Sequence, residues 1–374
     1  MQTLRAPALT GTKVQSPRRV DSERITELAV AMEARLNAAI ARISDLNGQT
    51  KIISVNAKME AARAGGNAGA AFGVVAQSIQ QVSAETASVA RHLATDSRSV
   101  CTELREVNTE LATRVKGERL SDLALMNIDV IDRNLYERSC DCRWWATDRS
   151  VVDVLADPTP QSTAFCSMRL GQILDSYTVY FDIVVADLAG RVVANGRPEH
   201  FASAGSRQHS AVWFGSAMST ASGAEFGFES VHRSELVNGE RILAYSCTVR
   251  EQGDVNGRVL GVLAILFRWD ALAQTIVRNT PLSDREKELT RVCIVDAHRR
   301  ILADTAECFL EVLPLNGIGP LLLGSKNYVV IDGAADGAVI GHARAPGFET
   351  YSTGWHSLII QQSSAKAAMN LPAA

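Results

Sequence analysis

Apolar side chains recur at alternating spacings of three and four residues over most of the first third of the chain, in residues 25–60 and again in residues 75–111. This spacing is the heptad pattern of coiled-coil helices. Residues 64–69 (AGGNAG) separate the two runs, and their glycines favour the positive φ angles of a tight turn. The pattern predicts an antiparallel coiled-coil hairpin over residues 21–116.

Each arm of this hairpin would be about 65 Å long and would carry one narrow apolar stripe. A single hairpin of this kind has little core. Pairing two hairpins into a four-helix bundle is the simplest way to bury both stripes, so we predict a homodimer. A plain dimerisation stalk fits the periodicity equally well.

The helical pattern resumes after Gly117 and continues towards Leu155, where the sequence Asp157-Pro-Thr-Pro160 ends it. Beyond this point the apolar period shortens to that of strands, with one helical connection around Trp213 and Phe214. The predicted strands are residues 177–185, 191–194, 226–231, 241–245, 259–269, 291–296, 300–303, 328–332, 338–341 and 355–360.

Two stretches repeat one plan, in which a strand ends in Asp, turns at small or basic residues and re-enters as a strand. They are residues 184–194 (VVADLAGRVVA) and residues 293–303 (CIVDAHRRILA). Two unrelated hairpins would also explain them, but the matched spacing favours tandem α+β modules. The predicted fold is therefore multidomain, with an N-terminal all-α hairpin followed by two antiparallel sheet modules on a long helix.

Composition places the chain among ordinary globular proteins, with 46% hydrophobic and 21% charged residues. The net charge of −3 provides no basic field, and we predict no nucleic-acid partner. The longest apolar run, residues 259–267, is about half as long as a membrane-spanning helix, so it predicts a buried strand. The first twenty residues are basic and lack an apolar segment. We therefore predict a cytoplasmic protein without a membrane span, with a disordered tail at residues 1–20 and a second tail at residues 364–374.

The seven cysteines have no metal-binding spacing, and reduced thiols in the cytosol fit them best. Cys140 and Cys142 form a CxC sequence, which keeps thiol-based sensing as an alternative function. The chain contains no nucleophile elbow, HExxH, Walker loop or GxGxxG sequence. We therefore predict that the protein is not an enzyme and has no metal or other cofactor.

The turn region of the hairpin has a specific sequence in both arms. Residues 49–65 (QTKIISVNAKMEAARAG) and 69–76 (GAAFGVVA) resemble the tip of the signalling domain of methyl-accepting chemotaxis proteins. In that family the tip binds a histidine kinase and its coupling adaptor, so the resemblance implies both as partners. Polar side chains at a helix end offer directional hydrogen bonds, and apolar ones offer area to desolvate. The corresponding kinase- and adaptor-binding positions are Asn56, Glu60, Arg63, Phe72, Val74 and Val75.

Structural roles are the alternative for these six residues. Phe72, Val74 and Val75 would plug the end of the bundle. Glu60 and Arg63, which are three residues apart on a helix, would form an exposed ion pair worth about 0.2–0.5 kcal/mol.

Residues 119–363 resemble a double Cache sensor, in which two PAS-like antiparallel sheets are attached to one long helix. The resemblance rests on short stretches such as 134–138 (NLYER), 145–148 (WATD) and 248–253 (TVREQG). It implies that the first module holds a small ligand among aromatic side chains. The candidate ligand-binding residues are Phe181, Trp213, Phe214 and Tyr245.

Residues 117–157 are then the connecting and sensor helix, residues 158–280 the first module and residues 281–363 the second. Core packing is the alternative role for each aromatic candidate. Amino-acid-binding members of the class carry Arg two residues before the tryptophan, and Ala211 at this position argues against an amino-acid ligand. His209 nearby is expected at the surface.

The sequence thus predicts a cytosolic chemoreceptor-like transducer that senses a small molecule and controls a histidine kinase through its hairpin tip. The hairpin precedes the sensor, so the response has to leave through the sensor's first helix. The alternative is a dimeric small-molecule-binding or scaffold protein with a degenerate tip, which the unusual Gly48 and Gly66 favour.

Overall fold

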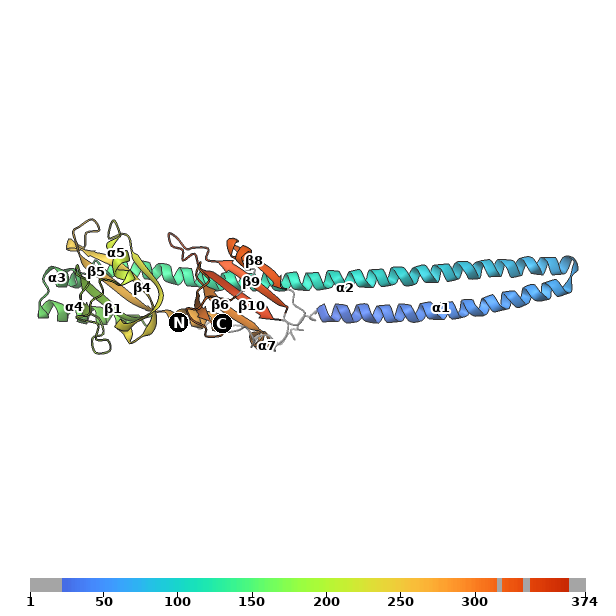
Figure 1. Ribbon diagram of the computed structural model, residues 1–374, viewed down its shortest axis with the longest axis horizontal. Coiled ribbons are helices and arrows are strands. Elements are labelled where there is room, and N and C mark those ends of the chain that lie inside the picture. Colours follow the sequence, from blue (N-terminus) through green and yellow to red (C-terminus); the bar gives the residue numbers. More distant parts are fainter. Residues whose placement is uncertain (1–21, 315–317, 332–336, 363–374) are drawn as a thin grey trace, which may run out of the picture. The chain divides into compact units, whose positions relative to one another are not determined.

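The computed structural model describes residues 22–314, 318–331 and 337–362 (Figure 1). It divides into two compact units, Met1–Val115 and Lys116–Ala374. The tails expected at residues 1–20 and 364–374 lie outside the described residues.

Two helices form the first unit. Helix α1 (Ser22–Ala64) is followed after Gly65 by helix α2 (Gly66–Trp145), whose later residues belong to the second unit. Gly65 and Gly66 both have φ angles of +61°, which glycine adopts without steric cost. The turn is therefore shorter than the expected segment 64–69, because the second helix begins already at Gly66.

The two helices of the first unit lie antiparallel, since residues late in this part of α2 contact residues early in α1. Asn47 Nδ2 donates a hydrogen bond to the Ser83 carbonyl at 2.8 Å, and Ser83 Oγ donates one to Asn47 Oδ1 at 2.6 Å. Farther from the turn, Arg105 forms an ion pair with Glu33.

Small side chains line the contact between these helices at heptad spacing. Gly69, Ala76, Ser83 and Ala90 recur every seven residues along α2, and all four are buried. A Cβ atom at Gly69 would overlap the carbonyl oxygen of Ala61. The helices approach each other closely because these positions have little or no side chain.

Most of the large apolar side chains of the predicted heptad pattern are exposed in a single hairpin. Val89, for example, keeps 66% of its surface exposed. We call this set the apolar seam. Its members are Met32, Ile43, Leu46, Ile53, Val75, Val82, Val89, Leu93, Val100, Leu104, Val107 and Leu111.

The second unit contains two five-stranded antiparallel sheets, which confirms the sheet modules expected from the strand pattern. The strand order is β2-β1-β5-β4-β3 in the first sheet and β7-β6-β10-β9-β8 in the second, so both sheets have the same topology. The first sheet consists of β1 (Tyr180–Asp187), β2 (Val192–Asn195), β3 (Gly227–Ser234), β4 (Glu240–Arg250) and β5 (Val259–Arg268). The second consists of β6 (Thr290–Val295), β7 (Ile301–Asp304), β8 (Lys326–Ile331), β9 (Ala338–Arg344) and β10 (His356–Gln362).

Short helices connect the strands and cover the sheets. They are α3 (Arg149–Ala156), α4 (Pro160–Ser176), α5 (Val212–Met218), α6 (Trp269–Arg278), α7 (Asp284–Glu288) and α8 (Gly319–Leu323), with the 3₁₀ turns η1 (Glu235–Val237) and η2 (Glu251–Gly253).

The helix expected to continue towards Leu155 is interrupted. Helix α2 ends at Trp145, and α3 starts after Asp148, whose carboxylate accepts a hydrogen bond from the Ser150 N–H at 2.9 Å. An aspartate in this role is a typical N-cap, which satisfies a free N–H group at the start of a new helix.

Helix α4 is not indicated by the sequence pattern. It begins with a capping box between Thr159 and Ser162, and Pro160 lies in its first turn, where a missing N–H costs nothing. The proline expected to end a helix instead starts one.

Helix α2 supplies the centre of the core of the second unit. Its buried face carries Leu120, Ile128, Ile131 and Leu135, and the inner faces of both sheets pack against it (Figure 1). The outer face of the first sheet is covered by α5, and residues of α8 pack on the outer face of the second. Strand β5, the expected buried run, lies in the middle of the first sheet.

Candidate functional site

The six candidate kinase- and adaptor-binding residues all have exposed side chains near the turn of the first unit. Phe72 is 66% exposed, and Val74 and Val75 are exposed to a similar degree. Glu60 and Arg63 form an ion pair of 2.8 Å on the helix surface. Within one chain, Phe72, Val74 and Val75 therefore do not plug the tip, and the site offers apolar area together with two charges.

Three of the four aromatic ligand candidates share the outer face of the first sheet. Trp213 and Phe214 lie in α5, where they are only 2% and 3% exposed, and Phe181 of β1 packs at the margin of the same cluster. The floor under them is formed largely by small and branched aliphatic side chains of β1, β4 and β5. Trp213 and Phe214 pack as core side chains on this face, and Phe181 is more exposed than either of them.

Hydrogen bonds hold helix α5 against this face. The Trp213 N–H donates to Glu229 Oε2 at 3.0 Å, and Ser246 Oγ donates to the Trp213 carbonyl at 2.7 Å. Gly227 permits the close approach, because a Cβ atom there would overlap the backbone of Ala217. Ala211 precedes α5 and provides no side-chain cap.

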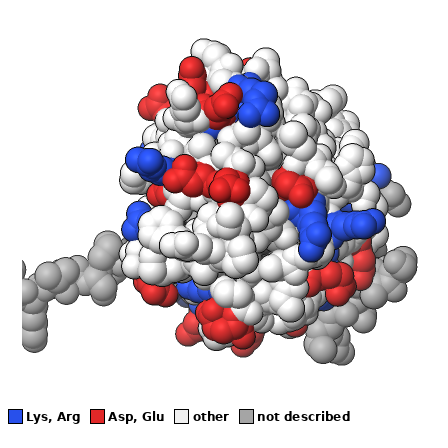
Figure 2. Space-filling model, turned by 90° about the vertical axis from the view of Figure 1, so that its left-hand side faces the viewer, with Lys and Arg blue, Asp and Glu red and all other residues white. Residues whose placement is uncertain are grey.

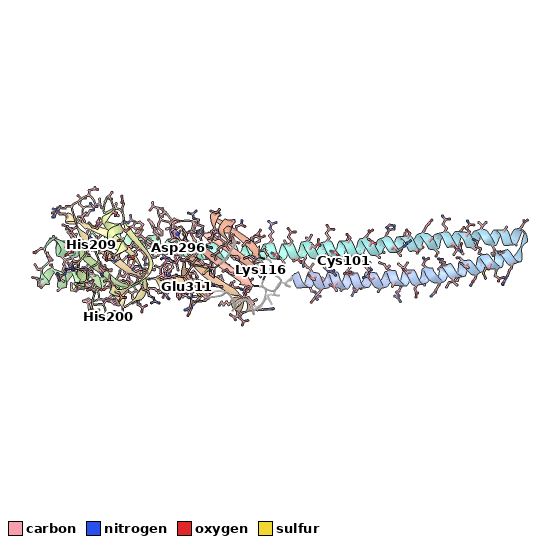
Figure 3. All side chains as sticks on the ribbon, viewed as in Figure 1. Cys101, Lys116, His200, His209, Asp296 and Glu311 are labelled. Carbon is pink, nitrogen blue, oxygen red and sulfur yellow. The ribbon has the colours of Figure 1, made fainter. Side chains whose placement is uncertain are left out.

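The most accessible part of this region is at Phe181. The Arg268 guanidinium lies 4.4 Å from its ring centroid, and the Phe201 ring is 6.3 Å away. Burial lowers the pKa of Arg268. His209 is exposed on the first module, as expected, with its ring 6.0 Å from that of Phe214 (Figure 3). An aromatic ring beside a cation can contact both the apolar and the anionic part of a small ligand.

Tyr245 is separated from the other candidates, because it lies on the inner face of the first sheet. Side chains of a strand alternate between faces, so Ala244 points to the cluster around Trp213 and Tyr245 points away from it. Its hydroxyl forms a hydrogen bond with the hydroxyl of Tyr351, which follows β9 in the second module. Tyr245 thus connects the two modules.

Asp132 is a functional candidate that the sequence reading did not single out. It is fully buried on α2, between the apolar positions Ile128 and Leu135. Its carboxylate accepts hydrogen bonds from the Gly347 N–H at 3.0 Å and from Thr353 Oγ1 at 2.7 Å. Burial raises its pKa. A single acidic residue within an apolar helix face was the available sequence clue.

Three close contacts attach the first residues of α2 that belong to the second unit to the second sheet. At Gly117 a side chain would overlap the ring of Tyr328 in β8. At Gly341 in β9 a side chain would overlap the backbone of Leu120. Ser121 Oγ donates to the carbonyl of Asn327 at 2.7 Å. Gly117 therefore does not interrupt the helix, and instead allows helix and sheet to meet.

Asp182 forms a buried polar cluster at the end of the first sheet. Its carboxylate accepts hydrogen bonds from the N–H groups of Ile183, Gly196 and Arg197 and from Asn195 Nδ2, all between 2.8 and 3.0 Å. Burial raises its pKa to about 6, against the effect of these hydrogen bonds. The cluster fixes the β1–β2 corner.

The cysteines are all free thiols. Cys142 is fully buried and burial raises its pKa well above the ordinary value, whereas Cys140 is half-buried on another side of the helix. Side chains two residues apart on a helix do not face each other, so this pair is not placed for a disulfide. Among the described residues there is no group of three or more His, Cys, Asp or Glu side chains arranged to hold a metal ion.

One end of the second unit carries surface charges of both signs. The end of the second unit that carries α3 and α4 shows acidic and basic side chains interspersed with wide uncharged areas (Figure 2). Within the described ranges, no helix is both long enough and apolar enough to cross a membrane.

No protein-family model matches the chain, and no curated protein matches its sequence. Solved structures resemble it. The sensory domain of the Campylobacter jejuni chemoreceptor Tlp3 (CcmL) is 13% identical, with a TM-score of 0.50 over 67% of this chain and 95% of that domain. The ligand-binding domain of the Pseudomonas fluorescens chemoreceptor CtaA in complex with L-serine is 14% identical, with a TM-score of 0.48 over 67% of this chain and 98% of that one.

The sensor domain of the V. cholerae histidine kinase DctB is 12% identical, with a TM-score of 0.45 over 67% of this chain and 96% of that domain. Identities this low establish the fold alone. The second unit therefore has the fold of a chemoreceptor sensory domain, in agreement with the double Cache-like resemblance of its sequence.

Proposed function

We propose that this protein is a signal transducer, in which the tandem sheets sense a small molecule and the tip of the helical hairpin controls a chemotaxis histidine kinase through its coupling adaptor. The sensory-domain fold supports the first half of this proposal. The resemblance of residues 49–76 to a chemotaxis receptor tip supports the second. The protein acts in the cytoplasm and is not an enzyme.

The proposal rests on the continuity of helix α2, which contains residues of the hairpin tip and residues of the sensory unit. Residues 66–115 of α2 carry the second arm of the tip, and residues 117–135 carry the contacts to the second sheet. A ligand-dependent shift of the sheets would change the position or bending of this helix, and the tip would then bind its partners differently.

A homodimer is part of this proposal. The apolar seam remains exposed in a single chain, and exposed apolar side chains that recur along a helix pair are typical of an interface. Two copies that pair their seams would form a four-helix bundle, in which the small-residue stripes hold each hairpin together and the large residues hold the two hairpins to each other.

Kinase capture tests the tip. Full-length protein immobilised on beads is incubated with the chemotaxis kinase and adaptor of the source organism. We expect the native chain to retain both, and Glu60→Ala and Phe72→Ala to reduce capture at least about tenfold, because truncating a hot-spot residue of an interface costs about 2 kcal/mol or more. Thr95→Ala, an exposed change on α2 away from the tip, is the matched control.

Two results would refute kinase coupling. One is a native chain that captures neither protein, and the other is unchanged capture by both tip variants. If the chain is still dimeric and still binds a small molecule, the scaffold alternative then replaces the transducer.

A thermal-shift screen of metabolites on the full chain tests the sensor. A ligand that binds only the native state raises the unfolding midpoint. We expect Phe181→Ala to reduce the shift, because Phe181 is only partly buried and its removal need not collapse the core. The exposed change His298→Ala in the second module should leave the shift intact. An equal shift in Phe181→Ala would place the ligand elsewhere.

A further inference from the structure

Two histidines form a buried pair in the second sheet. His342 lies in β9 and His356 in the neighbouring β10, and they are 0% and 6% exposed. The imidazoles stack with centroids 5.1 Å apart, and His342 Nε2 lies 2.9 Å from His356 Nδ1. One N–H therefore serves both rings, which requires that one of the two facing nitrogens is unprotonated.

Protonation of this pair has a specific structural cost. His342 Nδ1 is buried and has no hydrogen-bond partner among the described residues. In the neutral pair this nitrogen is an unprotonated acceptor, provided that His342 donates to His356. In a charged His342 it becomes an N–H donor without an acceptor, next to a second imidazole. Burying an unpaired donor or an uncompensated charge is costly in a protein interior.

Few charged groups compensate such a charge. Among the described residues, Arg344 of β9 disfavours a charge on His356 and Asp296 at the end of β6 favours one. Asp296 is already engaged with Arg300 and with the backbone of its own turn. Helix α8, which covers this face of the sheet, consists of glycine, proline and leucines. On β8, the residue opposite His342 is the uncharged Asn327.

The pair lies directly behind the place where the sheet holds α2. His342 is flanked by Gly341, whose backbone packs on Leu120 from the other face of the sheet. The carbonyl of Asn327, which pairs with His342 across the strands, accepts the hydrogen bond of Ser121. A change in the spacing of β9 and β10 at the pair would therefore reach both contacts with the helix.

We propose that the His342–His356 pair makes the second sheet an acid-sensitive switch, which loosens the attachment of α2 when the pH falls. This regulation is independent of any small ligand in the first module. It requires no metal or partner, because the imidazoles themselves take up the proton.

A fall in pH should destabilise the folded state at this pair, because proton binding is linked to folding. Burial, with the neighbouring imidazole adding to it, lowers the pKa of His342 to about 4, and burial lowers that of His356. A group with a lowered pKa in the folded state stabilises that state above its unfolded pKa of about 6.5, and this contribution is lost as the pH falls towards 4. Asp132, whose pKa is raised, contributes with the opposite sign, so variants of the histidines are needed to isolate the effect.

Hydrogen exchange on the full-length chain tests the switch. After correction for intrinsic rates, we expect the opening equilibrium of residues 117–124 and 338–344 to rise about tenfold or more between pH 7.5 and 5. The double variant His342→Gln/His356→Asn keeps one N–H donor facing one acceptor but cannot be protonated, so it should not lose protection in these segments as the pH falls. His200→Gln, an exposed histidine in the first module (Figure 3), should behave as the native chain does.

A native chain with pH-independent protection in these segments would overturn the proposal, and so would a double variant that responds to pH as the native chain does. A second measurement needs no variant and covers the case in which the double variant does not fold. In histidine-labelled native protein, NMR should show one imidazole that titrates at least one pH unit below the exposed histidines. Titration of all seven near pH 6.5 would exclude the switch.

Discussion

At the scale of single residues, two positions on α2 decide how the sensory unit is built, and both are unusual for a helix. Gly117 has no side chain where the ring of Tyr328 lies against the helix. Asp132 is charged where the neighbouring positions are apolar. Glycine and aspartate are poor helix formers, so their presence reflects contacts with other elements.

Gly117→Ala should destabilise the second unit. The added methyl overlaps the Tyr328 ring close to its Cγ, which cannot move far without displacing β8, and overpacking of this kind costs about 1–3 kcal/mol. Thermal unfolding of the full chain measures the change. Gly215→Ala is the matched control, because it is helical and has open space around it, so it should be neutral or slightly stabilising. Equal midpoints for the two variants would contradict the close contact.

The raised pKa of Asp182 predicts how the stability of the fold depends on pH. Its pKa is raised to about 6 by burial, so the folded state binds the proton more tightly than the unfolded chain. Its stabilising contribution is therefore present below about pH 4 and is lost as the pH rises through 6, by roughly 2–3 kcal/mol. Asp182→Asn should remove this slope in urea unfolding measured between pH 4 and 6.5. An unchanged slope in the variant would show that the carboxyl group is ionised normally.

At the scale of elements, the loop between β9 and β10 links the modules to the helix. Gly347 and Thr353 of this loop bind Asp132, and Tyr351 of the same loop binds Tyr245 of the first sheet. One loop therefore contacts the helix and both modules. A shift of the first sheet can reach α2 through it.

Asp132→Ala should release this loop from α2. Three hydrogen bonds to the loop are lost, while the cost of burying the carboxylate is relieved, so overall stability should fall by about 1–2 kcal/mol. Hydrogen exchange of residues 345–355 should accelerate. Asp129→Ala, one turn away and paired with Arg133 at the surface, should leave that loop protected. Equal exchange in both variants would show that the loop is held by other contacts.

At the scale of the whole molecule, the apolar seam predicts the oligomeric state. Val89→Glu/Val100→Glu places two charges on the seam and should convert the native dimer to monomers, since a buried unpaired charge costs several kcal/mol per subunit interface. Sedimentation velocity measures the mass. Thr95→Glu/Thr102→Glu adds the same charge at exposed positions off the seam and should stay dimeric. A native chain that sediments as a monomer at micromolar concentration would disprove seam pairing.

The sequence by itself determined the strands, the long helices and the repeat. Strand alternation and heptad spacing are local properties, since they depend on which residues must face a core, and they located the strands of both sheets and the long helices. Local capping was harder to recognise. Asp148 and Thr159 start helices through hydrogen bonds to residues two or three positions away, and Pro160 lies at the start of a helix although the sequence pattern favours a stop there.

Only the tertiary structure decided which faces meet. Tyr245 belongs to the contact between the modules and not to the cluster at Trp213. It lies on the inner face of β4, and the sequence alone does not show which element packs on that face. In the hairpin, small residues form the contact between the helices and the apolar seam stays exposed. The close approach of the two helices decides this, because only small side chains fit between them. The hydrogen-bond partners of Asp132 are 215 and 221 residues away along the chain, so a pattern of neighbouring residues cannot predict them.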